Sequence, residues 1–170
     1  KEKPLKRGLN KAVADSYGIP VCDYHWIKDG RDWTSDQGEV VANAELTTDP
    51  PVPLSYAFAS DTMYVPETAE YVKGVDLLYH ESTFCEDRAD RALTTMHSTA
   101  KEAARVAQEA GAKNLLIGHY SARYRDFDRF EKEAKTVFEA TLRARELHAY
   151  KVGHHGVEVV SLAKKHADEK

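Results

Sequence analysis

Four short polar stretches from residue 60 onward contain the side chains that bind metals and transfer protons. They are Ser60-Asp61-Thr62, His80-Glu81-Ser82-Thr83-Phe84, His97-Ser98-Thr99 and Gly118-His119-Tyr120-Ser121-Ala122-Arg123-Tyr124. Histidine nitrogen and carboxylate oxygen are the usual non-thiolate ligands of zinc. A carboxylate can also bridge two metals, and a Glu/His pair can pass a proton to a leaving oxygen. Together, Asp61, Glu81, His97 and His119 predict a metal-dependent hydrolase.

Each of these residues also has a simpler explanation when it is taken alone. Asp61-Thr62 after a strand is typical of a turn or a cap. His80 beside Glu81 is typical of a satisfied pair at a sheet edge, and His97 of a neighbour of a helix start. His119 fits a buried histidine bonded to the backbone. The functional interpretation depends on all four stretches occurring in one chain.

The elements that would position these residues alternate between strands and helices. Apolar runs predict strands at 54–60, 75–79, 114–118 and 146–152, and the remaining patterns predict helices at 66–72, 99–110 and 128–142. Thr99 with Glu102 predicts a capping box, and Gly111 predicts the helix end. This alternation predicts an α/β fold. Ligand groups in open α/β sheets collect at the carboxyl ends of the strands, where the polar residues fall.

The region before residue 54 has a different pattern. A short helix is expected near residues 9–16 and β-structure over 24–46, with turns at Asp29-Gly30 and Gln37-Gly38. The three prolines in residues 50–53 exclude a helix there and predict a stiff connection.

Length and composition limit the classes of protein to which this chain can belong. A chain of 170 residues predicts one domain, and its formal net charge of −4 excludes nucleic-acid binding by overall charge alone. No apolar run is long enough to span a membrane, so no membrane partner is expected. The two cysteines, Cys22 and Cys85, form no CxxC pair, which excludes a zinc ribbon and favours a reducing, cytoplasmic location.

The four polar stretches resemble the second half of the ribonuclease Z family, which belongs to the metallo-β-lactamase superfamily. They resemble that family's Gly-Asp-Thr, His-Glu-Ala-Thr-Phe, His-Ser-Thr and His-(Phe/Ile)-Ser-x-Arg-Tyr. The resemblance covers roughly residues 5–155 and is strongest from 59 to 125. It implies a single partial domain over 1–170, half of an αββα sandwich, with one mixed sheet, covering helices and an N-terminal β-hairpin.

The resemblance also implies roles for individual residues. Asp61 would bridge two zinc ions and His119 would bind one of them. His97, oriented by Glu81, would be the catalytic proton donor when water activated by zinc removes the 3′ trailer of precursor tRNA; DNA is not expected as a substrate. Ser121 and Arg123 would contact RNA phosphate, although Arg123 fits a structural salt bridge equally well.

Two departures from the family pattern affect these expectations. Ile19-Pro20-Val21-Cys22 stands where the family has Ile-Pro-Pro-Gly, and none of the eight histidines forms the family's His-x-His-x-Asp-His. His154-His155 is interpreted as an ordinary surface pair. With an incomplete ligand set, the chain alone is predicted to be inactive, and its uncovered inner sheet face predicts a homodimer.

Two other functions stay open at this point. One is another hydrolase of the metallo-β-lactamase fold, such as a phosphodiesterase or arylsulfatase relative, because ligands do not specify the substrate. The other is a non-catalytic fragment that keeps the site residues without using them.

Overall fold

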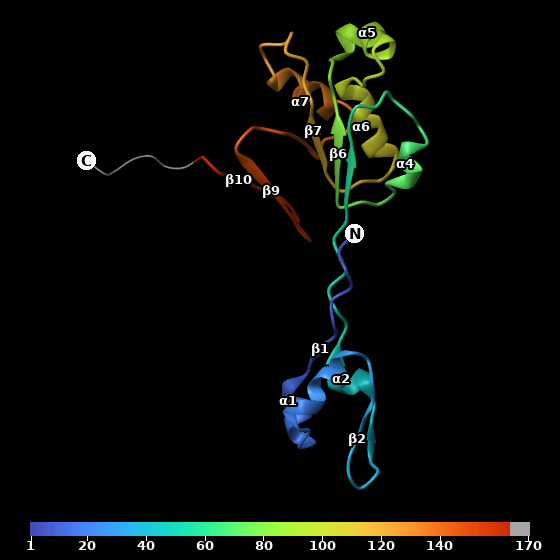
Figure 1. The fold of residues 1–170 in the computed structure, drawn as a ribbon, viewed down its shortest axis with the longest axis vertical. Coiled ribbons are helices and arrows are strands. Elements are labelled where there is room, and N and C mark those ends of the chain that lie inside the picture. The colour runs from blue at the N-terminus through green and yellow to red at the C-terminus, as the bar shows by residue number, and fades with distance from the viewer. Residues whose placement is uncertain (164–170) are drawn as a thin grey trace, which may run out of the picture. The chain divides into compact units, whose positions relative to one another are not determined.

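A computed structural model describes residues 1–163 of the chain, which form two compact units, residues 1–53 and residues 54–163 (Figure 1). Among the described residues, no helix is long and apolar enough to cross a membrane. The assignment of both units to a single partial domain over 1–170 stays a prediction. Each unit has its own hydrophobic core.

The first unit packs short elements around a small core. Its helical elements are α1 (Lys11–Ser16), η1 (Val21–Asp23), α2 (Tyr24–Lys28) and α3 (Asn43–Leu46). Two-residue antiparallel pairs join β1 (Gly8–Leu9) to β4 (Thr47–Thr48) and β2 (Trp33–Thr34) to β3 (Val40–Val41). The buried apolar side chains are Ala14, Ile19, Ile27, Val41 and Leu46.

The sequence prediction for this unit is confirmed in part. The short helix near 9–16 and the N-terminal β-hairpin, β2–β3, are present. The prediction of β-structure over 24–46 is wrong at both ends, where α2 and α3 lie. The buried Asn43 amide donates to the carbonyls of Ile27 and Arg31 at 2.7 and 2.8 Å. This side chain satisfies backbone groups that a partner strand would otherwise bond.

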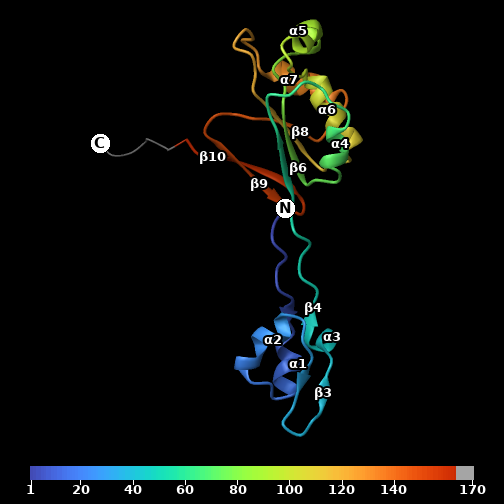
Figure 2. The same ribbon diagram turned by 45° about the vertical axis from the view of Figure 1, so that its right-hand side comes forward.

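The second unit is built on a four-stranded sheet with the order β5-β6-β7-β8. The strands are β5 (Tyr56–Ala59), β6 (Leu77–Glu81), β7 (Leu115–Gly118) and β8 (Thr141–Arg143), and all three pairings are parallel. The predicted α/β class is therefore confirmed, whereas the predicted mixed sheet is parallel throughout. Figure 2 shows β8 and β6 beside the helices of this unit.

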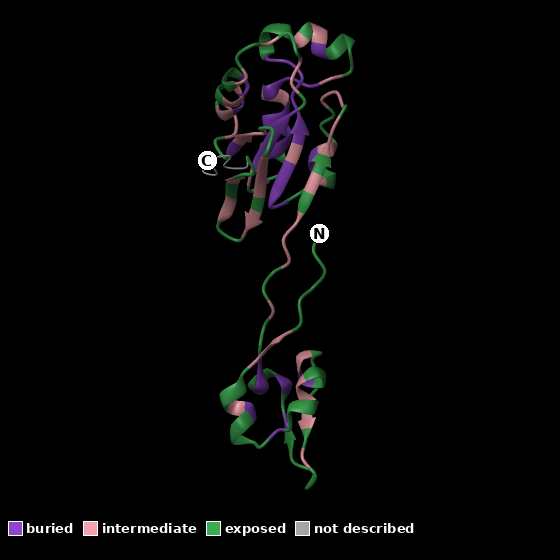
Figure 3. Cartoon of the chain, turned by 60° about the vertical axis from the view of Figure 1, so that its left-hand side comes forward, coloured by how far each residue is buried: buried purple, intermediate pink, exposed green. Residues whose placement is uncertain are grey.

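Two amphipathic helices, α6 (Ala100–Glu109) and α7 (Asp128–Lys135), share a core with β6 and β7. Shorter helical elements, α4 (Thr68–Tyr71), η2 (Glu86–Arg88) and α5 (Ala89–Thr94), lie in the connections. An antiparallel hairpin of β9 (His148–Gly153) and β10 (Gly156–Ser161) follows the sheet. Figure 3 shows that burial is concentrated on the central strands, while β5 alternates between exposed and half-buried residues.

The start of α6 is fixed by the predicted capping box. Thr99 Oγ1 accepts from the Glu102 N–H at 3.2 Å, and the Thr99 N–H donates to the Glu102 carboxylate at 2.8 Å. Gly111, with φ of +60°, ends the helix as expected. The alanines of α6 are buried, so the helix backbone lies close to the sheet. Thr99, the residue before α6, is therefore held at a defined position.

The helix predicted over 128–142 ends at Lys135, and β8 follows it after a short turn. Phe130 and Ala134 are buried on the inner side of α7 as predicted. A three-residue edge strand is too short to produce a period-2 pattern, so β8 has no separate signal in the sequence.

Asp76, at the start of β6, ties the beginnings of three strands together. Its carboxylate accepts from the Ser55 N–H and hydroxyl at 2.7 and 2.8 Å and from Lys113 Nζ at 2.6 Å. Its carbonyl accepts from the Asn114 amide at 3.0 Å. The bond from Lys113, assisted by those from Ser55, outweighs burial and lowers the Asp76 pKa from 3.8 to about 2.

Replacing Asp76 with Ala is expected to lower the free energy of unfolding by about 3 kcal/mol, because the half-buried Ser55 and the Lys113 ammonium lose a charged acceptor. The folded pKa is lower than the unfolded one, so this stabilisation is present above about pH 4 and is lost as the pH falls toward 2. Urea unfolding at pH 7 and pH 3 measures both effects. Lys151→Met, which alters an exposed ion pair with Glu158, is the control, and an equal loss in both variants would contradict the role of Asp76.

Candidate metal centre and active site

The parallel sheet brings the predicted site residues to one end of the second unit. Asp61 follows β5, Glu81 ends β6, and His119 follows β7. Parallel strands place their carboxyl ends along the same edge, so these residues become neighbours. His97 comes from the connection between α5 and α6, where its N–H donates to the Ala92 carbonyl at 2.8 Å. One ligand atom each of Asp61, His97 and His119 lies within 4.8 Å of the others.

Glu81 is the fully buried centre of this arrangement. One carboxylate oxygen accepts from the Thr62 N–H at 3.2 Å and from His97 Nδ1 at 2.7 Å. The other accepts from the Thr83 N–H and hydroxyl at 2.9 and 2.8 Å. A buried carboxylate is tolerated when its oxygens receive such bonds. Glu81 thus joins the loop after β5, the loop after β6 and His97.

Both imidazole rings are oriented through this carboxylate. The bond from His97 Nδ1 to Glu81 leaves Nε2 of His97 free. The Thr83 hydroxyl donates to Glu81, so its oxygen accepts from His119 Nδ1 at 2.8 Å. His119 Nε2 then faces the Asp61 carboxylate at 3.2 Å. Fixing the proton on Nδ1 leaves Nε2 as the ligand atom, and metal-binding histidines are commonly oriented by such a hydrogen bond from the other ring nitrogen.

Further hydrogen bonds connect the loops that carry the site. The Ser98 hydroxyl donates to the Thr62 carbonyl at 2.7 Å, which links the His97 segment to the loop after β5. The Ser121 N–H donates to the Thr83 carbonyl at 3.0 Å, which links the loops after β6 and β7. The site is therefore held by the backbone and not by its functional side chains alone.

Backbone conformations with positive φ concentrate at this site. Among the described residues, four non-glycine residues have positive φ: Asp61 (50°), Met96 (57°), His119 (62°) and Leu147 (56°). Two are members of the cluster, and Met96 precedes a third member. Such conformations cost about 1–3 kcal/mol each and persist where the surroundings impose them, commonly at functional sites. The strain supports a functional interpretation of Asp61, His97 and His119.

The donor set fits a divalent transition metal such as zinc. The Asp61 carboxylate and the His119 imidazole are ligand types that zinc binds, and a ring nitrogen of His97 lies within 4.8 Å of their ligand atoms. Asp61 and His119 are partly open to solvent, with side-chain exposures of 70% and 40%, whereas His97 is 24% exposed. Among residues 1–163 this is the one group of three potential ligands found so close together.

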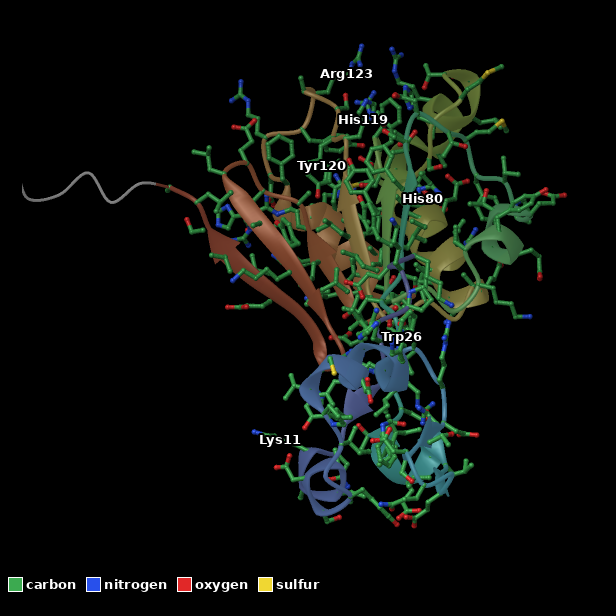
Figure 4. All side chains as sticks on the ribbon, turned by 60° about the horizontal axis from the view of Figure 1, so that its bottom comes forward. Lys11, Trp26, His80, His119, Tyr120 and Arg123 are labelled. Carbon is green, nitrogen blue, oxygen red and sulfur yellow. The ribbon has the colours of Figure 1, made fainter. Side chains whose placement is uncertain are left out.

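Ser121 and Arg123 lie in the loop after β7. The Ser121 hydroxyl oxygen accepts from the Arg123 N–H at 3.4 Å, so it stabilises its own loop. Arg123 is exposed and lies at the same end of the second unit as His119 (Figure 4). No ion pair of Arg123 occurs within the described part of the chain, so the salt-bridge alternative gains no support. Contact of either residue with RNA stays a prediction.

Three other histidines that the sequence analysis considered lie outside the cluster. His80 is buried, donates from Nδ1–H to the Glu81 carbonyl at 2.8 Å, and has its pKa lowered by burial. His154 and His155 are exposed at the β9–β10 turn, as the surface interpretation predicts. Thr83 was not assigned a role from the sequence, although its place two residues after Glu81 was a usable signal.

Comparisons with known proteins identify what this chain resembles. No family model matches it. It is 50% identical to the ribonuclease Z of Porphyromonas gingivalis and 46% identical to that of Bacteroides fragilis, in each case over 145 residues, or 85% of this chain and 48% of the relative. The chain therefore spans about half the length of the curated relatives it matches. These matches confirm the resemblance to ribonuclease Z.

Among solved structures, the chain is similar to the metallo-beta-lactamase fold protein YhfI from Bacillus subtilis, with 32% identity and a TM-score of 0.47 over 51% of this chain and 34% of that one.

Replacing Thr83 with Val is expected to release His119 while leaving Glu81 in place. Without the hydroxyl, His119 Nδ1 has no acceptor, so neutral His119 shifts toward the form with the proton on Nε2. Ring ¹⁵N NMR at pH 8 measures this population directly. Thr83→Ser keeps the hydroxyl and should retain the wild-type spectrum. An unchanged His119 spectrum in Thr83→Val would contradict the role of Thr83.

Proposed function

We propose that this chain is part of a zinc-dependent endoribonuclease that removes the 3′ trailer of precursor tRNA. The observation that carries the proposal is the Glu81-centred pair of imidazoles beside Asp61, in a sequence similar to ribonuclease Z. The relatives are ribonucleases Z, and the enzyme class is taken from them. The geometry supports a hydrolytic reaction because a proton donor and metal-binding groups lie side by side.

Asp61 and His119 would hold zinc, which supplies activation of water and neutralises phosphate charge when it is bound. His97 would act as the proton donor to the leaving 3′ oxygen, since one of its ring nitrogens lies within 4.8 Å of the ligand atoms of Asp61 and His119. Glu81 would keep the His97 ring in that orientation. Ser121 and Arg123 would contact the RNA phosphates at the same end of the unit.

The described residues on their own supply few ligands for two metals. If His97 acts as a proton donor, Asp61 and His119 are the two protein ligands left in the cluster. Catalytic zinc sites use three, so further ligands from outside this set are needed for a two-metal centre. We therefore propose that the 170-residue chain alone does not cleave precursor tRNA.

A reconstituted protein tests the proposal. Residues 1–155 replace the matching part of the Porphyromonas gingivalis relative, and cleavage of a precursor tRNA is compared with hydrolysis of bis-p-nitrophenyl phosphate. The chimera should cleave the tRNA at a defined 3′ position, and the chain alone should not. His97→Ala in the chimera should lower kcat by about 10²–10⁴, because a positioned general acid contributes that much.

The control variant in the same chimera is His155→Ala, which alters an exposed histidine outside the cluster. It should cleave at the wild-type rate. Hydrolysis of the small diester without cleavage of tRNA would favour the alternative of another metallo-β-lactamase-fold hydrolase. Full activity of His97→Ala would favour the non-catalytic interpretation of this residue.

We also propose that the chain forms a homodimer in the cytoplasm. Tyr56 and Phe58 of β5 are 51% and 64% exposed, whereas Ala57 between them packs against the helix-covered core. Large apolar side chains on an open sheet face favour association. The free cysteines Cys22 and Cys85 suit a reducing compartment.

Phe58→Ser should shift the chain toward monomer in analytical ultracentrifugation, because it removes apolar area from this face. Leu93→Ser alters a leucine of equal exposure, 64%, on α5 and serves as the control. A monomeric wild type, or equal behaviour of the two variants, would contradict the proposed dimer face.

A further inference from the structure

A pocket of about 760 Å³ adjoins the candidate metal centre. His119 forms part of its wall and is also a member of the metal-binding cluster. The remaining wall comes from Tyr79 of β6, from the end of β7, from the loop after it and from residues 143–146. This volume lies within the range of small-molecule sites, about 300–1,000 Å³. A group bound here would therefore lie next to the reacting centre.

The aromatic residues of the wall provide flat apolar surfaces. Tyr79 stacks on Phe58 with ring centroids 4.6 Å apart, and Tyr120 packs on Phe127 at 5.4 Å. Gly118 makes room for Tyr79, because a Cβ there would lie 2.5 Å from the Tyr79 hydroxyl. Aromatic side chains of this kind stack on nucleic-acid bases.

The pocket also contains two arginines in a chain whose net charge is −4. Arg143 is committed to an ion pair with Asp128 at 2.7 Å. Arg145 is exposed, and no ion pair involving it occurs among residues 1–163. Its guanidinium is thus available for a phosphate, which it binds with a fork of N–H donors.

The segment that carries Arg145 is held in place. Tyr150 of β9 donates from its hydroxyl to the Arg143 carbonyl at 2.8 Å and accepts from the Arg145 N–H at 2.9 Å. The Ala144 N–H donates to the Ile117 carbonyl at 2.8 Å. Glu146, on the same wall, offers a carboxylate that can accept from an exocyclic amino group.

We propose that this pocket binds one nucleotide of single-stranded RNA next to the bond that is cut. The base would lie against the aromatic wall, and Arg145 would bind its phosphate. The proposal rests on the proposed function in one respect, namely that the ligand belongs to an RNA substrate. Glu146 favours a base with an exocyclic amino group, such as adenine or cytosine.

Binding of adenosine monophosphate to the 170-residue chain in EDTA tests the pocket without metal or catalysis. In ¹H–¹⁵N NMR titrations, the largest shifts should fall on Gly118, His119 and Ala144. Arg145→Ala should raise Kd about tenfold, equal to the loss of one charge-assisted contact. Tyr79→Leu should also weaken binding, and Arg88→Ala, which removes an exposed arginine outside the pocket, should not.

Adenosine, inorganic phosphate and inosine monophosphate separate the sources of affinity. Each should bind more weakly than adenosine monophosphate, because each lacks the phosphate, the base or the amino group. Equal binding of inorganic phosphate, shifts centred elsewhere, or no effect of Arg145→Ala would overturn the proposal. The titration measures binding and not cleavage. Its result therefore does not depend on whether the chimera cuts tRNA.

Discussion

The buried carboxylate of Glu81 is the constraint on which the rest of the site depends. A charge without solvent contact is stable in a protein only when hydrogen bonds replace water. Glu81 therefore requires donors from two loops and from His97 at fixed positions. The same bonds orient His97 directly and His119 through Thr83. One requirement for burial thus produces the geometry of two functional imidazoles.

The sheet makes this arrangement possible because its strands are aligned at the end opposite the site. Asp76 joins the beginnings of the strands, and the cap at Thr99 fixes the start of α6, so the opposite strand ends meet in register. Positive φ at Asp61 and His119 then turns the chain at the points where the functional side chains leave the sheet. The energetic cost of these conformations is offset by the hydrogen bonds around Glu81.

The sequence predicted most of what depends on regular patterns. Strand-end polar residues and the capping box identified the cluster and α6, because both follow from local chemistry. The bond from His119 Nδ1 to the Thr83 hydroxyl was not predicted, because it joins two loops whose residues are 36 positions apart. The helices α2 and α3 were mistaken for β-structure because the stabilising contacts of Asn43 are tertiary. Three-residue β8 was too short to leave a pattern.

The central claim is that the strand ends deliver Asp61 and His119 to one metal while His97 remains free to donate a proton. A crystal structure of the chain in excess zinc, with anomalous data collected at the zinc edge, tests it most directly. The account predicts a peak about 2.0–2.2 Å from His119 Nε2 and from an Asp61 oxygen, with His97 outside bonding distance. Zinc bonded to His97, or a peak confined to His154 and His155, would contradict it.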